Sequence, residues 1–143
     1  MTTQQDLTSR DMYKDWLILI VDDTPDNLTV AKAVLKFHGA NVYTASSGVE
    51  ALAILEQITP TVILLDIRMP TMDGWELYRA IRENPNPTVQ HIPIIALTAY
   101  AMNSDRERIL GMGFDGYISK PFELAHFLTN IKDIVAHAVK QGN

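Results

Sequence analysis

Two kinds of hydrophobic pattern alternate along the chain. Short, nearly continuous apolar runs predict buried strands, and stretches in which apolar residues recur every three or four positions predict helices with one buried face. The predicted strands comprise residues 16–21, 41–45, 61–66, 92–98 and 114–119. A predicted helix follows each strand, beginning near residues 25, 48, 74, 105 and 123, and the last helix ends at residue 139.

Polar residues and glycines at the expected positions mark where these helices begin and end. Thr24 is a candidate N-cap with Pro25 at the first helical position, and Asp73 is a candidate cap of the third helix. Capping boxes at residues 47–50 and 104–107 start two more helices. Glycines end the helices near residues 39 and 111–113, and the NPNP sequence at residues 84–87 ends the third helix.

The alternation of strand and helix predicts an α/β fold. Five strands joined by helical crossovers form a parallel sheet with helices on both faces. All strands then end at the same edge of the sheet. The chain has 143 residues, which suits one domain, and residues 1–15 are expected to form a polar tail or a short docked helix.

Composition and charge exclude several functions and compartments. The chain has no cysteine, which excludes disulfides, thiolate nucleophiles and cysteine-based metal sites. Its formal charge of -5 argues against nucleic acid or an anionic membrane as the main partner. The polar start lacks a secretion signal, and the apolar run at residues 16–21 is too short to cross a bilayer. We therefore expect a soluble cytoplasmic protein.

Five chemically active side chains lie at the ends of the predicted strands. Asp22 and Asp23 directly follow the first strand, Asp66 ends the third and Thr98 the fourth, and Lys120 directly follows the fifth. Carboxylates brought together repel one another unless a cation offsets their charge, and hard oxygen ligands suit Mg²⁺. With a lysine ammonium and a hydroxyl at the same edge, the set matches a phosphoryl-transfer site with a carboxylate nucleophile.

Each of these residues also has a simpler interpretation when it is taken alone. Asp22 and Asp23 fit solvated turn acids, Thr98 fits an ordinary β-branched strand residue, and Lys120 fits an exposed lysine. A phosphoryl-transfer site is favoured because the groups that it needs occur together at the ends of these strands.

Four motifs resemble those of the receiver domain of two-component response regulators. They are VDD after the first strand, LLDIRMPTMDG around the third, ALTAYA after the fourth and GYISKPF after the fifth. The resemblance covers residues 16–139, with tails at 1–15 and 140–143, and implies a flavodoxin-like, doubly wound sheet with strand order 2-1-3-4-5.

The resemblance also implies a role for each residue at the strand ends. Asp66 is similar to the phosphoacceptor, and Asp22 and Asp23 to the Mg²⁺ ligands, with the backbone carbonyl of Arg68 as a further ligand. Thr98 is similar to the switch hydroxyl that follows the phosphoryl group.

The motif after the fifth strand implies three further features. Lys120 resembles the lysine that pairs with the phosphoryl group, and the bond to Pro121 is a candidate cis peptide. Tyr117 matches the aromatic residue that turns inward on activation, although packing of an edge-strand aromatic on the last helix explains it equally well. In the motif after the fourth strand, Tyr100, two residues after Thr98, is bulky enough to shield the phosphoryl group from water.

We therefore expect a single-domain response regulator whose donor is a histidine kinase or a histidine phosphotransfer protein. It would signal through a downstream protein partner or a relay component, and would catalyse only its own phosphorylation and dephosphorylation. The alternatives are a pseudo-receiver that is never phosphorylated, a flavodoxin-like binding module and a small aspartate-nucleophile phosphatase. The phosphatase is disfavoured because its second acid lies two residues after the nucleophile, whereas Asp22 and Asp23 are adjacent.

Overall fold

A parallel sheet of five strands forms the centre of the molecule. The computed structural model describes residues 11–68, 73–99, 103–120 and 123–141. The strands are β1 (Leu17–Val21), β2 (Asn41–Ala45), β3 (Val62–Asp66), β4 (Ile94–Thr98) and β5 (Gly116–Ser119). They pair in the order β2-β1-β3-β4-β5, all parallel, which confirms the predicted fold class and strand order.

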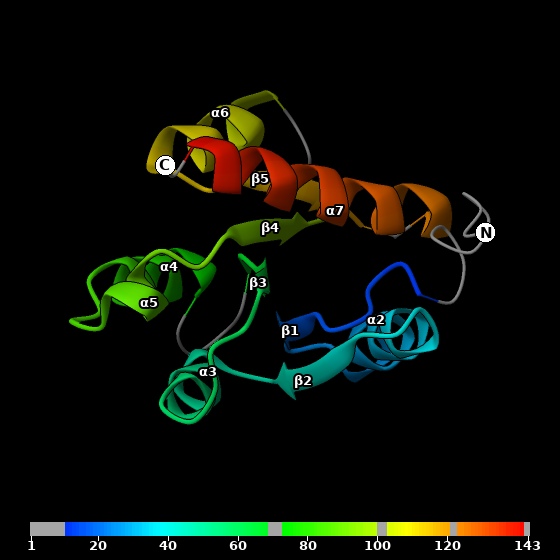
Figure 1. Ribbon diagram of the computed structural model, residues 1–143. Helices are drawn as coiled ribbons and strands as arrows, with labels where there is room; N and C mark the ends of the chain where they lie inside the picture. Colours follow the sequence, from blue (N-terminus) through cyan, green and yellow to red (C-terminus); the bar gives the residue numbers. More distant parts are fainter. Residues whose placement is uncertain (1–10, 69–72, 100–102, 121–122, 142–143) are drawn as a thin grey trace.

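Helices cover both faces of this sheet. They are α2 (Pro25–Phe37), α3 (Gly48–Leu55), α4 (Gly74–Arg82), α5 (Pro87–Gln90), α6 (Asn103–Met112) and α7 (Leu124–Gln141). One buried cluster joins the sheet to α3, α4, α5 and α6, and a second joins it to α2 and α7. In Figure 1, α3, α4 and α5 lie on one side of the sheet and α2 on the other. In the described part of the chain, no helix is both long and apolar enough to cross a membrane.

Strands β3 and β4 are buried along their whole length because both faces of the sheet are covered. Each carries five consecutive buried residues, VILLD in β3 and IIALT in β4, as the continuous apolar runs predict. The edge strand β2 alternates instead between exposed and more buried residues. The last positions of β3 and β4 are the polar residues Asp66 and Thr98, which are buried with the strands they end.

The ends of several elements differ from the sequence prediction. The first, third, fourth and fifth strands begin one or two residues later than predicted, and α7 continues to Gln141 instead of ending at residue 139. The short helix α5 was not predicted, because its NPNP sequence was interpreted only as an interruption. Asn86 in fact caps this helix by accepting a hydrogen bond from Thr88 N at 3.0 Å, and Pro87 occupies its first position.

The capping box predicted at residues 104–107 is wrong, because α6 already begins at Asn103 and Ser104 lies within the helix. The caps predicted at Ser47 and Thr24 are present, each with one change. Ser47 accepts a hydrogen bond from Glu50 N at 3.1 Å, but the Glu50 carboxylate accepts from Ser46 N, one residue before the cap. Thr24 occupies the N-cap of α2 without a capping hydrogen bond from its side chain. Its backbone N–H donates to Asp22 Oδ1 at 2.9 Å, so the start of α2 is joined to the acidic residues after β1.

Residues 11–15 pack against the domain. Tyr13 is fully buried; its hydroxyl donates to the Leu128 carbonyl on α7, and its backbone N–H donates to His38 O at 2.8 Å. Lys132 Nζ of α7 donates to Met12 O at 2.7 Å. The division at residue 16 stays a prediction. The buried core, however, includes Met12 and Tyr13, which lie within the expected polar tail.

An aromatic cluster connects α4, α6 and the loop before β5. Trp75 meets Phe114 edge-on with ring centroids 5.8 Å apart, and Tyr78 stacks on Phe114 at 4.2 Å. The Arg108 guanidinium lies 4.0 Å from the centroid of the Trp75 ring, which is a cation–π contact. The first turn of α4 is thereby packed against α6.

Arg82 joins the end of α4 to the amino ends of β4 and β5. Its Nη1 donates to Gln90 O at 2.9 Å and to Ile92 O at 2.7 Å, and its Nη2 lies 3.1 Å from Asp115 Oδ2. Asp115 Oδ2 also accepts from Ile94 N at 2.8 Å. The guanidinium therefore donates hydrogen bonds to acceptors in three segments at once, which its planar, forked geometry allows.

We expect Arg82→Lys to lower the free energy of unfolding by about 1–3 kcal/mol, since an ammonium cannot reach all three acceptors and leaves partly buried groups unpaired. Urea denaturation measures the change. The control is Arg79→Lys, an exposed position on the same helix, where a change within about 0.5 kcal/mol is expected. Equal effects of the two substitutions would contradict the role assigned to Arg82.

Candidate functional site

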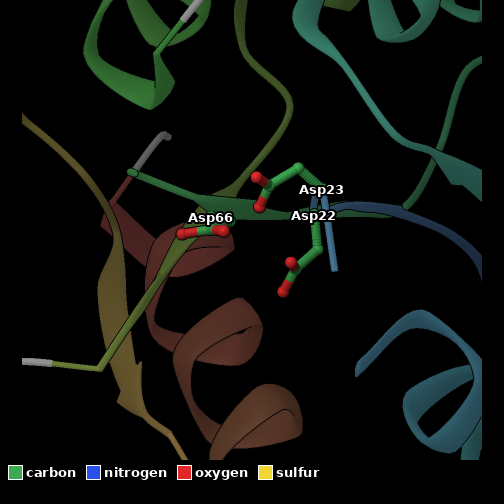
Figure 2. Close-up of side chains that lie close together, drawn as sticks. All are labelled: Asp22, Asp23 and Asp66. Atoms are coloured by element: carbon green, nitrogen blue, oxygen red, sulfur yellow. The ribbon is translucent and has the colours of Figure 1, made fainter. Parts of the chain in front are cut away.

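Three carboxylates gather at the carboxyl ends of β1 and β3. Side-chain oxygens of Asp22, Asp23 and Asp66 all lie within 4.8 Å of one another. Figure 2 shows the three carboxyl groups grouped around the ends of these neighbouring strands. Asp22 and Asp66 are buried, and Asp23 is the most exposed of the three. The structure therefore brings together the acids that the strand ends predicted, in a donor set that suits a hard divalent cation.

Burial and neighbouring charges perturb Asp66. Removal from water raises the pKa of this carboxyl group from its ordinary 3.8 to about 6, and the nearby charge of Asp22 acts in the same direction. Arg68 N donates to Asp66 Oδ1 at 3.0 Å and, with Lys120, partly opposes the rise in pKa. Near neutral pH, Asp66 is therefore mostly ionised and poorly solvated, as a carboxylate nucleophile requires.

Lys120 pairs with two of the three acids. Its Nζ lies 2.8 Å from Asp22 Oδ2 and 3.3 Å from Asp66 Oδ2, and the lysine side chain is 14% exposed. Lys120 N also donates to Thr98 O at 2.7 Å, which fixes the residue after β5 beside the end of β4. The predicted meeting of Lys120 with the acids is therefore observed.

Asp22 has additional partners that the sequence analysis missed. Besides Lys120, its carboxylate accepts from Thr24 N at 2.9 Å and from Asn27 Nδ2 at 3.3 Å. The sequence signal is an asparagine at the third position of a helix that begins with Thr24-Pro25, directly after the acids. A side chain at this position points back toward the start of the helix.

The other predicted site residues, Thr98, Tyr117 and Arg68, differ in exposure. Thr98 is buried at the end of β4, next to Ser119 of β5 in the sheet register. Tyr117 is partly buried on β5, and its hydroxyl accepts from Arg106 Nη1 of α6 at 3.0 Å. The Arg68 side chain is exposed. Tyr100 and Pro121, including the candidate cis peptide, lie outside the described residues.

Gly74 allows α4 to begin directly against the end of β3. A Cβ at this position would lie 2.3 Å from Ile67 Cα and 2.6 Å from Asp66 O. Gly74 N donates to Ile67 O at 3.2 Å, and the Asp73 side chain caps the helix through Glu76 N at 2.9 Å. In the sequence, Gly74 predicts only the start of a helix, and its close approach to the acidic site is not apparent there.

Comparison with protein families identifies relatives of the whole domain. A family model described as the response regulator receiver domain matches residues 18–132. The polar-differentiation response regulator DivK of Brucella ovis is 34% identical over 121 residues, covering 85% of this chain and 97% of DivK. Histidine kinase 3 of Arabidopsis thaliana is 41% identical over 125 residues, covering 74% of this chain and 12% of the kinase.

A solved structure agrees with this comparison. The receiver domain of the sensor histidine kinase PA1611 from Pseudomonas aeruginosa PAO1 superposes with a TM-score of 0.75 at 36% identity, covering 85% of this chain and 98% of that domain. A magnesium ion is coordinated in the active-site cleft of that protein.

We expect Gly74→Ala to destabilise the protein by about 1–3 kcal/mol, since the added methyl group must displace either α4 or the backbone that carries Asp66. Thermal or urea unfolding measures the loss. The matched control is Gly111→Ala on α6, where a Cβ would meet nothing within 4 Å. Alanine should be neutral there or stabilise the helix by up to about 1 kcal/mol. Equal stability of the two variants would contradict the close approach.

The raised pKa of Asp66 predicts that Asp66→Asn is more stable than the wild type at neutral pH. Between pH 3.8 and about 6 the folded state holds more protons than the unfolded state, so stability falls as the pH rises through this range. At pH 7 the asparagine variant, which carries no charge, should be more stable by about 3 kcal/mol, and the difference should shrink toward zero near pH 4.

Urea unfolding at several pH values, without divalent cations, measures this difference. Repeating the series with Mg²⁺ is the internal control, because a bound cation would favour the ionised carboxylate and narrow the gap at neutral pH. If the difference in stability does not change with pH, or if the variant is less stable at pH 7, burial does not raise the pKa of the Asp66 carboxyl group.

Proposed function

The chain belongs to the response regulator receiver family, and we propose that Asp66 accepts a phosphoryl group from a phosphohistidine of a histidine kinase or a histidine phosphotransfer protein. One observation carries the proposal. The Asp66 carboxylate is buried at the end of a central strand, 3.3 Å from the Lys120 ammonium and grouped with Asp22 and Asp23.

In the proposed reaction an oxygen of Asp66 attacks the phosphorus atom of the donor. A bond forms between that oxygen and phosphorus, the bond from phosphorus to the imidazole nitrogen breaks, and its electron pair remains on the nitrogen. The pKa of about 6 keeps most of Asp66 ionised near neutral pH, so no base has to remove a proton first. Lys120 offsets charge on the transferred group.

The acidic residues fit a bound Mg²⁺. Asp22, Asp23 and Asp66 offer carboxylate oxygens within 4.8 Å of one another, and the Arg68 carbonyl is the proposed further ligand. When bound, the cation supplies positive charge that offsets the phosphoryl oxygens and the mutual repulsion of the carboxylates. The magnesium ion in the related receiver domain of PA1611 supports this assignment.

Phosphorylation would act as a switch through Thr98 and Tyr117. A new dianionic group on Asp66 attracts the Thr98 hydroxyl and the Lys120 ammonium. Movement of Thr98 opens space that Tyr117 can fill. The Tyr117 hydroxyl accepts a hydrogen bond from Arg106, so an inward turn of the ring would break that bond and free α6 from β5 at this point.

The proposed output is a changed protein-binding surface or onward transfer in a phosphorelay. Turnover of an external substrate is not part of the proposal. The net charge of -5 supports protein partners over nucleic acid or anionic membranes. We also propose a cytoplasmic location, in keeping with the lack of cysteine in the chain.

We expect incubation with acetyl phosphate and Mg²⁺ to add one phosphoryl group to the wild type and none to Asp66→Asn. Intact mass spectrometry measures the gain. The modification should be cleaved by hydroxylamine, as an acyl phosphate is, and omission of Mg²⁺ should abolish it.

Beryllofluoride provides the second test, because it mimics the phosphoryl group without being hydrolysed. If the wild type gains no mass but binds beryllofluoride with Mg²⁺, rapid hydrolysis of the acyl phosphate explains the result and the proposal stands. If the wild type neither gains mass nor binds beryllofluoride, the chain is a constitutive interaction module and the proposed phosphorylation is wrong.

A further inference from the structure

The buried Asp22 carboxylate is fixed by three donors. Its Oδ1 accepts from Thr24 N at 2.9 Å. Its Oδ2 accepts from Asn27 Nδ2 at 3.3 Å and pairs with Lys120 Nζ at 2.8 Å. Two of these donors belong to the start of α2, and the third is the cation that also reaches Asp66. Asn27 and Lys120 therefore contact the same carboxylate oxygen, Asp22 Oδ2.

The start of α2 explains how Asn27 reaches Asp22. Thr24 is the N-cap, Pro25 the first helical residue and Asn27 the third. In a capping box the side chain at this third position folds back to accept the N–H of the cap residue. Here Asp22 already accepts the Thr24 N–H, and the Asn27 side chain folds back to donate to the other oxygen of Asp22. A carboxylate at position 27 would repel Asp22, whereas an amide can donate to it.

We propose that Asn27 is a positioning residue for the acidic site. Its amide fixes the plane of the Asp22 carboxylate and keeps Oδ2 from pairing with Lys120 alone, so that Lys120 remains within reach of Asp66. Without this donor, Asp22 can rotate about its side-chain bonds and draw the ammonium toward itself. The inference rests on the proposed function, since it concerns how Asp22 and Lys120 are oriented toward a bound cation and a phosphoryl group.

We expect Asn27→Leu, which is similar in size but has no donor, to weaken Mg²⁺ binding about tenfold, the usual effect of losing a hydrogen bond to a metal ligand. Isothermal titration calorimetry with Mg²⁺ alone measures the dissociation constant. Asn27→Gln keeps an amide at a position that suits glutamine, and should recover part of the lost affinity. The matched control is Thr29→Ala on the same helix, whose exposed hydroxyl donates to Pro25 O at 3.0 Å.

The amide proton resonance of Thr24 provides a readout that requires no metal. Thr24 N–H donates to Asp22 Oδ1, so its chemical shift reports the orientation of that carboxylate. In the metal-free protein we expect this resonance to move upfield in Asn27→Leu and to remain in place in Thr29→Ala, while the rest of the amide spectrum stays that of the folded protein.

The outcomes separate this inference from the proposed function. If wild type and Asn27→Leu bind Mg²⁺ with dissociation constants within about twofold of each other, far less than the loss expected for a positioning residue, the inference is wrong and the proposed function is unaffected. If the wild type binds no Mg²⁺, the proposed function fails, and the Thr24 resonance alone decides whether Asn27 positions Asp22. An unmoved Thr24 resonance overturns the inference in either case.

Discussion

The balance of charge between Lys120 and the buried acids is the interaction on which the rest of the site depends. A parallel sheet brings all of its strand ends to one edge, so acids that follow β1 and β3 must meet there. Burying such charges is unfavourable unless they are paired. The Lys120 ammonium contacts Asp22 and Asp66, but negative charge remains in excess. Burial raises the pKa of Asp66, and the neighbouring charge of Asp22 adds to the rise. In the proposed function, a divalent cation completes the balance.

Most of the fold could be predicted because its signals are local. Continuous apolar runs identified the strands, and caps and glycines identified most helix ends. Four strands begin later than predicted, because an apolar side chain does not reveal whether its backbone joins the hydrogen-bonded ladder. The helix α5 was missed because it has only four residues and begins with Asn-Pro, which also marks a loop. Met12 and Tyr13 were missed as core residues because two apolar residues between Asp11 and Lys14 form no hydrophobic pattern.

The composition of the site was predictable, but the way it is supported was not. Asp22, Asp23, Asp66 and Lys120 were found because strand ends converge in any parallel sheet, whatever the side chains do. The contact of Asn27 with Asp22 depends on the angle at which α2 leaves β1, and the close approach at Gly74 depends on how near α4 lies to β3. Both contacts depend on how two elements are placed relative to each other, and a hydrophobic pattern contains no information on that placement.

The two tryptophans of the chain lie at opposite ends of the sheet. Trp75 directly follows Gly74, beside the acidic edge, with its indole against Arg108 and Phe114. Trp16 precedes β1, and its ring meets Tyr13 edge-on at 4.8 Å. Because indole emission depends on nearby charges and on solvent, the protein contains two intrinsic fluorescent probes. Emission from Trp75 reports the contact between α4 and α6, and emission from Trp16 reports the docking of residues 11–15, without any attached dye.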